Sequence, residues 1–220
     1  MKITESYINK SSKIIKKKIY INSDHNKIYE FVYTIINRYH KNYHYDIFLT
    51  GGNTIHKFYN FLFTKKFKFK WKKVFLTDER ITNLYNETNQ KKINNSIPNF
   101  DFQNFFYKNK IFDKKKINIL NKKNFKNYIV LCSLGDDGHL ASIFQNNLSF
   151  KNYIYTKSRF HKFNRISISS KIFEKSKLTI LFALGKKKIK RLKLILDKRK
   201  TSKEPFSMLK NFIIISDHDL

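Results

Sequence analysis

Short apolar segments recur along this 220-residue chain, and segments with helical periodicity lie between them. Apolar runs without strict alternation are typical of strands that are covered on both faces. Strands that alternate with helices need crossover connections, and such connections build a mostly parallel, twisted sheet. We therefore predict an α/β fold in which helices flank such a sheet. The predicted strands are Ile47–Thr50, Val74–Thr77, Tyr128–Ser133, Arg165–Ser169, Leu178–Leu184 and Phe212–Ser216, and the predicted helices begin at Thr54, Leu140 and Lys187.

The length and spacing of these segments indicate one domain. A chain of 220 residues can bury a substantial core, and neither an internal repeat nor a linker rich in Pro, Gly or Ser divides it. Residues 1–21 lack the apolar core of a secretory signal, and no run approaches the length of a transmembrane helix. We expect a single domain over residues 1–220, a cytoplasmic location and no membrane partner.

The net charge of +30 would by itself suggest a nucleic-acid or acidic-membrane partner. However, Lys, Asn, Ile, Phe and Tyr are all enriched together, while Gly falls to 5 residues and Pro to 2. The enriched residues share codons rich in adenine and thymine, so gene composition accounts for the pattern. We expect no specific nucleic-acid partner. The positive field would still steer an anionic substrate toward the protein.

The sequence offers no pattern for a resident cofactor. Cys132 is the single cysteine, so neither an intramolecular disulfide nor a thiolate metal cluster can form. No dinucleotide fingerprint and no P-loop is present. The C-terminal stretch 217–219, Asp-His-Asp, could imitate a metal site, but chain ends are usually mobile. We expect neither a cofactor nor a metal.

A histidine follows the predicted strand Tyr128–Ser133 within a glycine-rich turn. The turn reads Leu-Gly-Asp-Asp-Gly-His and ends at His139, with Asp137 two residues earlier. In open α/β sheets, ligands bind outside the carboxyl ends of the strands. A histidine with acidic neighbours at such a place is suited to general-base chemistry, so we predict that His139 is the base.

Two kinds of anion-binding group accompany this turn. Gly51 and Gly52 follow another strand and let the backbone approach a ligand, and the next helix offers free N–H groups to an anion. Asn53 and Thr54 add side-chain donors.

Five ordered motifs resemble the 6-phosphogluconolactonases of the family that also contains glucosamine-6-phosphate deaminase. The motifs are Gly-Gly-Asn-Thr at 51–54, Asp-Glu-Arg at 78–80 with Thr-Asn at 88–89, Gly-Asp-Asp-Gly-His-Leu-Ala-Ser-Ile-Phe at 135–144, Arg-Ile-Ser-Ile-Ser at 165–169 and Gly-Lys-Lys-Lys at 185–188. The resemblance covers nearly the whole chain. It implies a Rossmann-like fold of the sugar-phosphate isomerase/lactonase type.

The resemblance also implies an activity, namely hydrolysis of 6-phosphogluconolactone to 6-phosphogluconate in the oxidative pentose phosphate pathway by a monomer without a cofactor. His139 would activate water and Asp137 would hold or polarise its imidazole. The sugar phosphate would be bound by Gly51, Gly52, Asn53, Thr54, Arg80, Arg165 and Lys188. Asp78 and Glu79 are expected to cap a turn or helix, with an ion pair that orients Arg80.

Three alternatives remain beside this hypothesis. A deaminase-like enzyme would resemble Asp-Glu-Tyr at 78–80 and would carry a functional Glu where Phe144 stands, and a phenyl group cannot handle protons. The second alternative is a decayed relative that keeps the fold but not the catalytic rate. It is suggested by four departures from the family's motifs, at Asn53, Ile55, Ser133 and Leu140. Ser133 replaces the family's first Gly of the His139 motif and would be strained if φ is positive there. The third alternative is a basic nucleic-acid-binding protein.

Overall fold

The computed structural model describes residues 2–10, 13–40, 45–65, 72–97, 106–108, 111–145, 149–157, 161–197 and 204–220. The helices are α1 (His25–His40), α2 (Asn53–Thr64), α3 (Asn89–Ser96), α4 (Lys115–Lys122), α5 (Ser170–Lys175) and α6 (Lys186–Leu196), with 3₁₀ turns η1 (Tyr85–Glu87) and η2 (Pro205–Met208). The strands are β1 (Lys2–Lys10), β2 (Lys13–Ile21), β3 (Asp46–Leu49), β4 (Lys73–Leu76), β5 (Asp78–Arg80), β6 (Tyr107–Lys108), β7 (Ile111–Phe112), β8 (Tyr128–Ser133), β9 (Tyr153–Thr156), β10 (Arg165–Ile168), β11 (Leu178–Ala183) and β12 (Phe212–Ser216).

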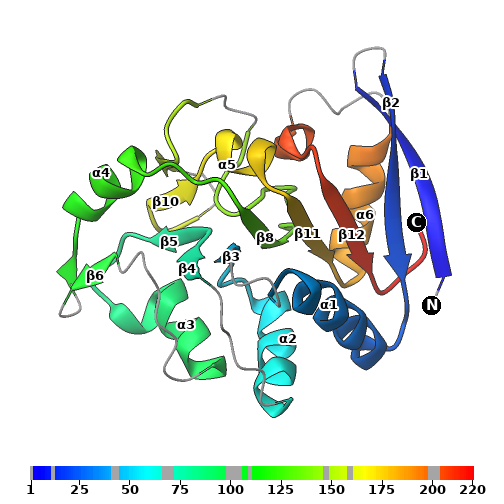
Figure 1. Cartoon of the computed structure of the whole chain (residues 1–220), viewed down its shortest axis with the longest axis horizontal. Coiled ribbons are helices and arrows are strands. Elements are labelled where there is room, and N and C mark those ends of the chain that lie inside the picture. Colours follow the sequence, from blue (N-terminus) through cyan, green and yellow to red (C-terminus); the bar gives the residue numbers. More distant parts are fainter. Residues whose placement is uncertain are drawn as a thin grey trace.

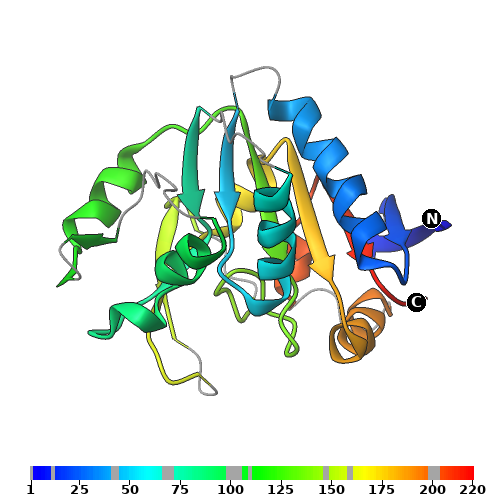
Figure 2. The same cartoon turned by 90° about the horizontal axis from the view of Figure 1, so that it is seen from below.

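A seven-stranded sheet forms the centre of the fold (Figure 1). Its strand order is β1-β2-β12-β11-β8-β3-β4, and every neighbouring pair is parallel except β1 with β2. All residues of β3 and β8 are buried, as expected of strands covered on both faces. Helices α1 and α2 lie together on one face of this sheet (Figures 1 and 2). The predicted α/β fold with a mostly parallel sheet is confirmed.

A second, antiparallel sheet lies beside the β4 edge and has the order β5-β10-β9. The chain leaves the main sheet at Thr77, whose carbonyl accepts the Ile168 N–H at 2.7 Å, and then continues as β5. The predicted strand at 165–169 is therefore present but belongs to this second sheet. Its register places Arg165 directly opposite Arg80. The sheet thus carries two of the predicted substrate-binding residues to one place.

The predicted helix at Leu140 is wrong, because this segment forms a series of tight turns. Single bridges pair Leu140 with Leu134 and with Ile143, and Ala141 adopts a φ of 53°. Ser142 donates its N–H to the Ser167 side chain at 3.1 Å. Contacts with a distant strand therefore replace the helical hydrogen bonds that the local sequence pattern suggested.

The helices that were predicted correctly have one apolar face. In α6, Ile189, Leu192 and Ile195 are buried, while most of its lysines point to solvent. This spacing of three residues places the apolar side chains on one helical face. Within the described residues, every helix is too short or too polar to cross a membrane. The expectation of a single domain stays a prediction.

Candidate active site

A cavity of about 570 Å³ opens at the carboxyl ends of β3 and β8. This is the edge at which ligands bind in open α/β sheets. All nine residues predicted for the site line the cavity, and Asp78 and His161 also line it. The nine are Gly51, Gly52, Asn53, Thr54, Arg80, Asp137, His139, Arg165 and Lys188. Residues from five separate motifs therefore meet around one space.

The loop after β8 folds back so that His139 lies over its own backbone. Gly135 donates its N–H to the His139 carbonyl at 2.9 Å, and Gly138 donates to the Gly135 carbonyl at 3.0 Å. A Cβ atom on Gly135 would fall on the imidazole ring of His139, so only glycine fits there. Gly138 has a φ of 93°, a conformation that favours glycine. These two glycines bring Asp137 and His139 side by side.

Asp137 and His139 form the closest polar contact in the cavity. The Asp137 Oδ1 and His139 Nδ1 atoms lie 2.5 Å apart. A carboxylate can only accept, so Nδ1 carries the proton and Nε2 is left free for a ligand. Burial alone would raise the pKa of Asp137, but the hydrogen bonds and the charge of His139 hold this pKa well below its usual range. Asp137 is therefore ionised at neutral pH and fixes the tautomer of His139.

His161 is a second histidine of the site that the sequence did not reveal. Its Nε2 atom lies 3.6 Å from Asp137 Oδ2, and its ring is perpendicular to that of His139 at a centroid distance of 5.5 Å. Phe144 packs against both rings at 5.1 and 5.2 Å. Burial and the charge of Arg165 lower the pKa of His161. It lies outside the five motifs, so only the folded chain places it beside Asp137.

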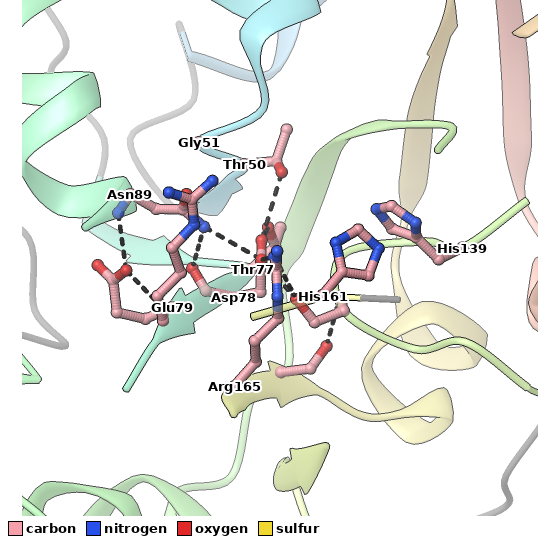
Figure 3. Close-up of polar contacts among 12 residues, drawn as sticks. Thr50, Gly51, Thr77, Asp78, Glu79, Asn89, His139, His161 and Arg165 are labelled. Atoms are coloured by element: carbon pink, nitrogen blue, oxygen red, sulfur yellow. Dashed lines mark hydrogen bonds and ion pairs between the residues drawn. The ribbon is translucent and has the colours of Figure 1, made fainter. Parts of the chain in front are cut away.

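Asp78 is buried at the centre of a hydrogen-bond network (Figure 3). Its carboxylate faces the Arg165 guanidinium at 3.5 Å and accepts from Ser142 Oγ at 2.7 Å. Thr77, Thr50 and the Asn89 amide also donate to it. Because these partners come from five segments, Asp78 holds Arg165 and the surrounding loops in place.

Glu79 caps helix α3, which confirms one of its expected roles. Its carboxylate accepts the backbone N–H groups of Arg80, Asn89 and Gln90 at 2.7 to 2.8 Å. Burial raises the pKa of Glu79 to about 7, although these hydrogen bonds oppose the shift. Thr88 accepts from the Lys91 N–H at 3.0 Å and so caps the same helix.

The expected ion pair with Arg80 is wrong. Among the described residues of this site, the ion pair joins Asp78 to Arg165, not to Arg80. The Arg80 guanidinium instead donates to the Glu87 carbonyl at 2.9 Å and lies 5.8 Å from the Phe163 ring centroid. Glu79 is occupied by backbone donors and Asp78 by Arg165 and side-chain donors, so neither carboxylate forms an ion pair with Arg80 among the described residues.

The cations keep donors available for a ligand. Arg80 donates to the Glu87 carbonyl and Arg165 donates to Ser142 Oγ at 3.3 Å, each through one N–H group. Lys188 donates one N–H to Ser133 Oγ at 2.8 Å. An arginine carries five N–H donors and a lysine three, so each cation has donors left over. The cavity is therefore prepared to receive an anion.

Asp137, His139 and His161 are the group of described residues closest to a metal-binding arrangement. Their ligand atoms lie within 4.8 Å of one another. However, two ligands of one tetrahedral ion with bonds of about 2.0–2.1 Å stand roughly 3.3 Å apart. The 2.5 Å contact of Asp137 with His139 is shorter, so an ion would have to replace that hydrogen bond. The expectation that no metal is needed stays a prediction.

Fold and cavity together define an α/β protein with an Asp–His pair and three cations around a cavity at the carboxyl edge of a parallel sheet. The chain belongs to the family of glucosamine-6-phosphate isomerases/6-phosphogluconolactonase, whose model matches residues 25–213. This result confirms the resemblance drawn from the motifs at the level of the family. Among curated proteins, none matches the chain.

Solved structures of 6-phosphogluconolactonases have the same fold. The enzyme from Thermotoga maritima is 22% identical with a TM-score of 0.73, over 91% of this chain and 99% of that one. The enzyme from Trypanosoma brucei is 18% identical with a TM-score of 0.73, over 92% and 96%. The enzyme from Plasmodium vivax is 18% identical with a TM-score of 0.68, over 93% and 91%. The fold therefore persists although the sequences have diverged widely.

Proposed function

We propose that this protein hydrolyses 6-phosphogluconolactone to 6-phosphogluconate, as a step of the oxidative pentose phosphate pathway. The observation that carries the proposal is the Asp137–His139 pair at 2.5 Å in a cavity that three cations line. Such a cavity suits a substrate with an ester carbonyl at one end and a phosphate at the other. A monomeric state, a cytoplasmic location and the absence of a nucleic-acid partner remain parts of the same proposal.

The reaction needs one base and no covalent intermediate. His139 Nε2 takes a proton from water as the water oxygen attacks the lactone carbonyl, and a tetrahedral intermediate forms. When the bond from this carbon to the ring oxygen breaks, the imidazolium returns its proton to that oxygen. Asp137 stabilises the imidazolium and keeps Nδ1 protonated. A base in this role contributes typically ~10²–10⁴-fold to the rate.

The remaining predicted residues hold the substrate. Helix α2 begins at Asn53, and no side chain caps its first N–H groups. These groups, with the side chains of Asn53 and Thr54 and the backbone of Gly51 and Gly52, suit a phosphate. The guanidinium groups of Arg80 and Arg165 and the ammonium group of Lys188 supply the positive charge. Binding energy at the phosphate would then orient the distant carbonyl toward His139.

The aromatic residue beside the base argues against the deaminase alternative. The Phe144 ring lies 5.2 Å from that of His139, where the deaminase branch would carry its functional Glu. A phenyl group can neither accept nor donate a proton, so the isomerisation would lack a participant. The decayed relative and the nucleic-acid-binding protein are alternatives that the experiment below separates from the lactonase.

The test is hydrolysis of freshly generated 6-phosphogluconolactone, measured above its spontaneous opening. The wild-type protein is expected to accelerate the reaction, and His139→Ala is expected to lose about 100-fold or more in kcat with an unchanged unfolding temperature. His218→Ala is the matched control, because His218 is an exposed histidine that does not line the cavity. Acceleration that survives in His139→Ala refutes the mechanism. No acceleration in the wild type favours the decayed relative.

A further inference from the structure

Ser133 and Lys188 form a contact that the proposed mechanism does not use. Ser133 is the last residue of β8 and Lys188 lies in the first turn of α6. The Lys188 ammonium donates to Ser133 Oγ at 2.8 Å, and both residues line the cavity. The strain expected at Ser133 required a positive φ, and it is not found. Among the described residues other than glycine, a positive φ occurs at Ala141 and not at Ser133.

The start of α6 is fixed so that Lys188 points inward. The Asp217 carboxylate accepts the Gly185 N–H at 2.8 and 3.0 Å, which ties the first turn to the end of β12. Ile189 is buried against the core, while Lys187 is exposed. Lys188 therefore lies between a buried and an exposed position, and its ammonium reaches the cavity.

The contact leaves hydrogen-bond donors on the lysine. The ammonium has three N–H groups and uses one of them on Ser133. The Ser133 hydroxyl accepts this bond, and its own hydrogen is directed at the Leu134 carbonyl, 3.5 Å away. That donation leaves Ser133 Oγ free to accept the bond from Lys188, so the serine can hold the ammonium in place. A ligand oxygen can thus accept from the two N–H groups of the ammonium that remain.

The Gly51–Thr54 loop lies next to this pair. A Cβ atom on Gly52 would stand 3.9 Å from the Ser133 side chain, at ordinary van der Waals distance. The ammonium, the hydroxyl and the start of α2 therefore surround one part of the cavity. Burial lowers the pKa of Lys188, while the negative charges of Asp136 and Asp137 oppose this shift and favour the charged ammonium.

We propose that Ser133 is a positioning residue, which holds the Lys188 ammonium beside the Gly51–Thr54 loop and completes with it a subsite for the phosphate group of the ligand. The inference rests on the proposed function for the identity of the ligand. The related family motif has Gly where Ser133 stands, and glycine offers no acceptor for a lysine. The hold of Ser133 on Lys188 thus distinguishes this chain from the family motif.

A different use of the same pair is a Ser–Lys nucleophile, in which a neutral lysine removes the serine proton and the hydroxyl oxygen attacks a carbonyl. Here Ser133 accepts a hydrogen bond from Lys188, and its own hydrogen is directed at the Leu134 carbonyl, away from the lysine that would have to remove it. The positioning role is therefore favoured, and the nucleophile is one outcome of the experiment.

The experiment compares Ser133→Ala, Ser133→Thr, Lys188→Ala and the double variant, with Lys187→Ala as the matched control for the loss of an exposed charge. Calorimetry measures the binding of inorganic phosphate and of 6-phosphogluconate, and steady-state assays measure lactone hydrolysis. Ser133→Ala is expected to weaken binding of both ligands and to raise KM by about 5- to 20-fold, because a hydrogen bond to a charged group is lost. The value of kcat is expected to stay within about 3-fold, and Ser133→Thr is expected to restore binding.

The double variant tests whether Ser133 acts through Lys188. It is expected to bind phosphate no more weakly than Lys188→Ala alone, since the serine has nothing left to position. Additive losses, or phosphate binding that Ser133→Ala leaves unchanged, overturn the proposal. A loss of more than about 100-fold in kcat with phosphate binding intact identifies a nucleophile instead.

Failure of the proposed function gives a different result from failure of this inference. A wild-type protein that does not accelerate lactone hydrolysis but binds phosphate through Ser133 and Lys188 refutes the function and supports the subsite. An active enzyme whose phosphate binding ignores Ser133 refutes the subsite and supports the function.

Discussion

Two groups of carboxylates lie at or next to the cavity and differ in burial: Asp78 with Glu79 is buried, and Asp137 is partly exposed. Asp78 and Glu79 are buried, and their carboxylates accept hydrogen bonds from five segments of the chain. The side chain of Asp137 is 40% exposed and contacts two histidines in one corner of the cavity. The first group joins the two sheets to the surrounding loops, and the second faces the space where a ligand would bind.

The pKa of Glu79 and the pKa of Asp137 shift in opposite directions, because Glu79 is fully buried while Asp137 is partly exposed and bonded to His139. Burial raises the pKa of Glu79 to about 7. At Asp137 the effect of burial is smaller than that of the His139 hydrogen bonds and charge, and the pKa is lowered. Under the proposed function, carboxylates thus stabilise the fold in one place and support proton transfer in another. Each prediction below asks whether this division holds.

The largest expected effect is on stability. Asp78→Ala leaves the buried Arg165 guanidinium without its carboxylate, and the loss of one partner of a buried ion pair costs about 3–5 kcal/mol. For a chain of this size the unfolding temperature should fall by roughly 6–20 °C. Asp136→Ala removes the same charge from an exposed position and should change stability by less than about 0.5 kcal/mol. Scanning calorimetry measures the unfolding temperature of both variants. An equal loss of stability in the two would contradict the structural role assigned to Asp78.

The pH dependence of stability gives the second prediction. The folded-state pKa of Glu79 lies above its ordinary 4.5, so the folded protein holds a proton that the unfolded chain releases. This contribution to stability is present below about pH 4.5 and is lost as the pH rises through about 7. Its upper bound is about 3 kcal/mol, at 1.36 kcal/mol per unit of pKa.

Glu79→Gln carries no titrating proton at this position. Urea unfolding at pH 5 and at pH 7.5 should therefore show a smaller decrease in the free energy of unfolding for Glu79→Gln than for the wild type. Identical pH dependence in the two proteins would show that Glu79 keeps its charge in the folded state.

The third prediction concerns catalysis and has the smallest expected energy. Asp137→Asn removes the charge that stabilises the imidazolium, and kcat should fall by about 100-fold, or about 2.7 kcal/mol. The unfolding temperature should change little, because the side chain is partly exposed. Asp136→Asn is the control from the same loop and should retain most of the activity. A large loss of stability in Asp137→Asn would show that Asp137 stabilises the fold, as Asp78 and Glu79 do.

Five of the seven strands of the main sheet, namely β3, β4, β8, β11 and β12, could be predicted because their signal is local. The run at β8 is apolar from Tyr128 to Cys132 and is followed by a glycine turn, so both the strand and its end are visible in the sequence. The same holds for β12 and for the apolar face of α6. The site residues could be predicted because they follow these strands directly or belong to motifs of a recognisable family.

The remaining features depend on contacts between distant segments. Leu140–Phe144 has a helical pattern, but Ser142 bonds to Asp78, 64 positions earlier in the chain, and this contact bends the segment into turns. The antiparallel pairing of β5 with β10 and the approach of His161 to Asp137 likewise arise only when the two sheets meet. No periodicity or spacing in the sequence encodes such pairings.

The register of the small sheet links ligand binding to folding. Arg80 and Arg165 lie directly opposite each other on adjacent strands, where like charges repel. Burial lowers the pKa of Arg165, the carboxylate of Asp78 opposes this shift, and the charge of Arg80 adds to it. Under the proposed function, an anion bound between the two guanidinium groups would remove this repulsion, so part of its affinity would come from the relief of repulsion between the two cations. The same anion would stabilise the folded chain, so occupancy of the cavity and integrity of the second sheet would rise together.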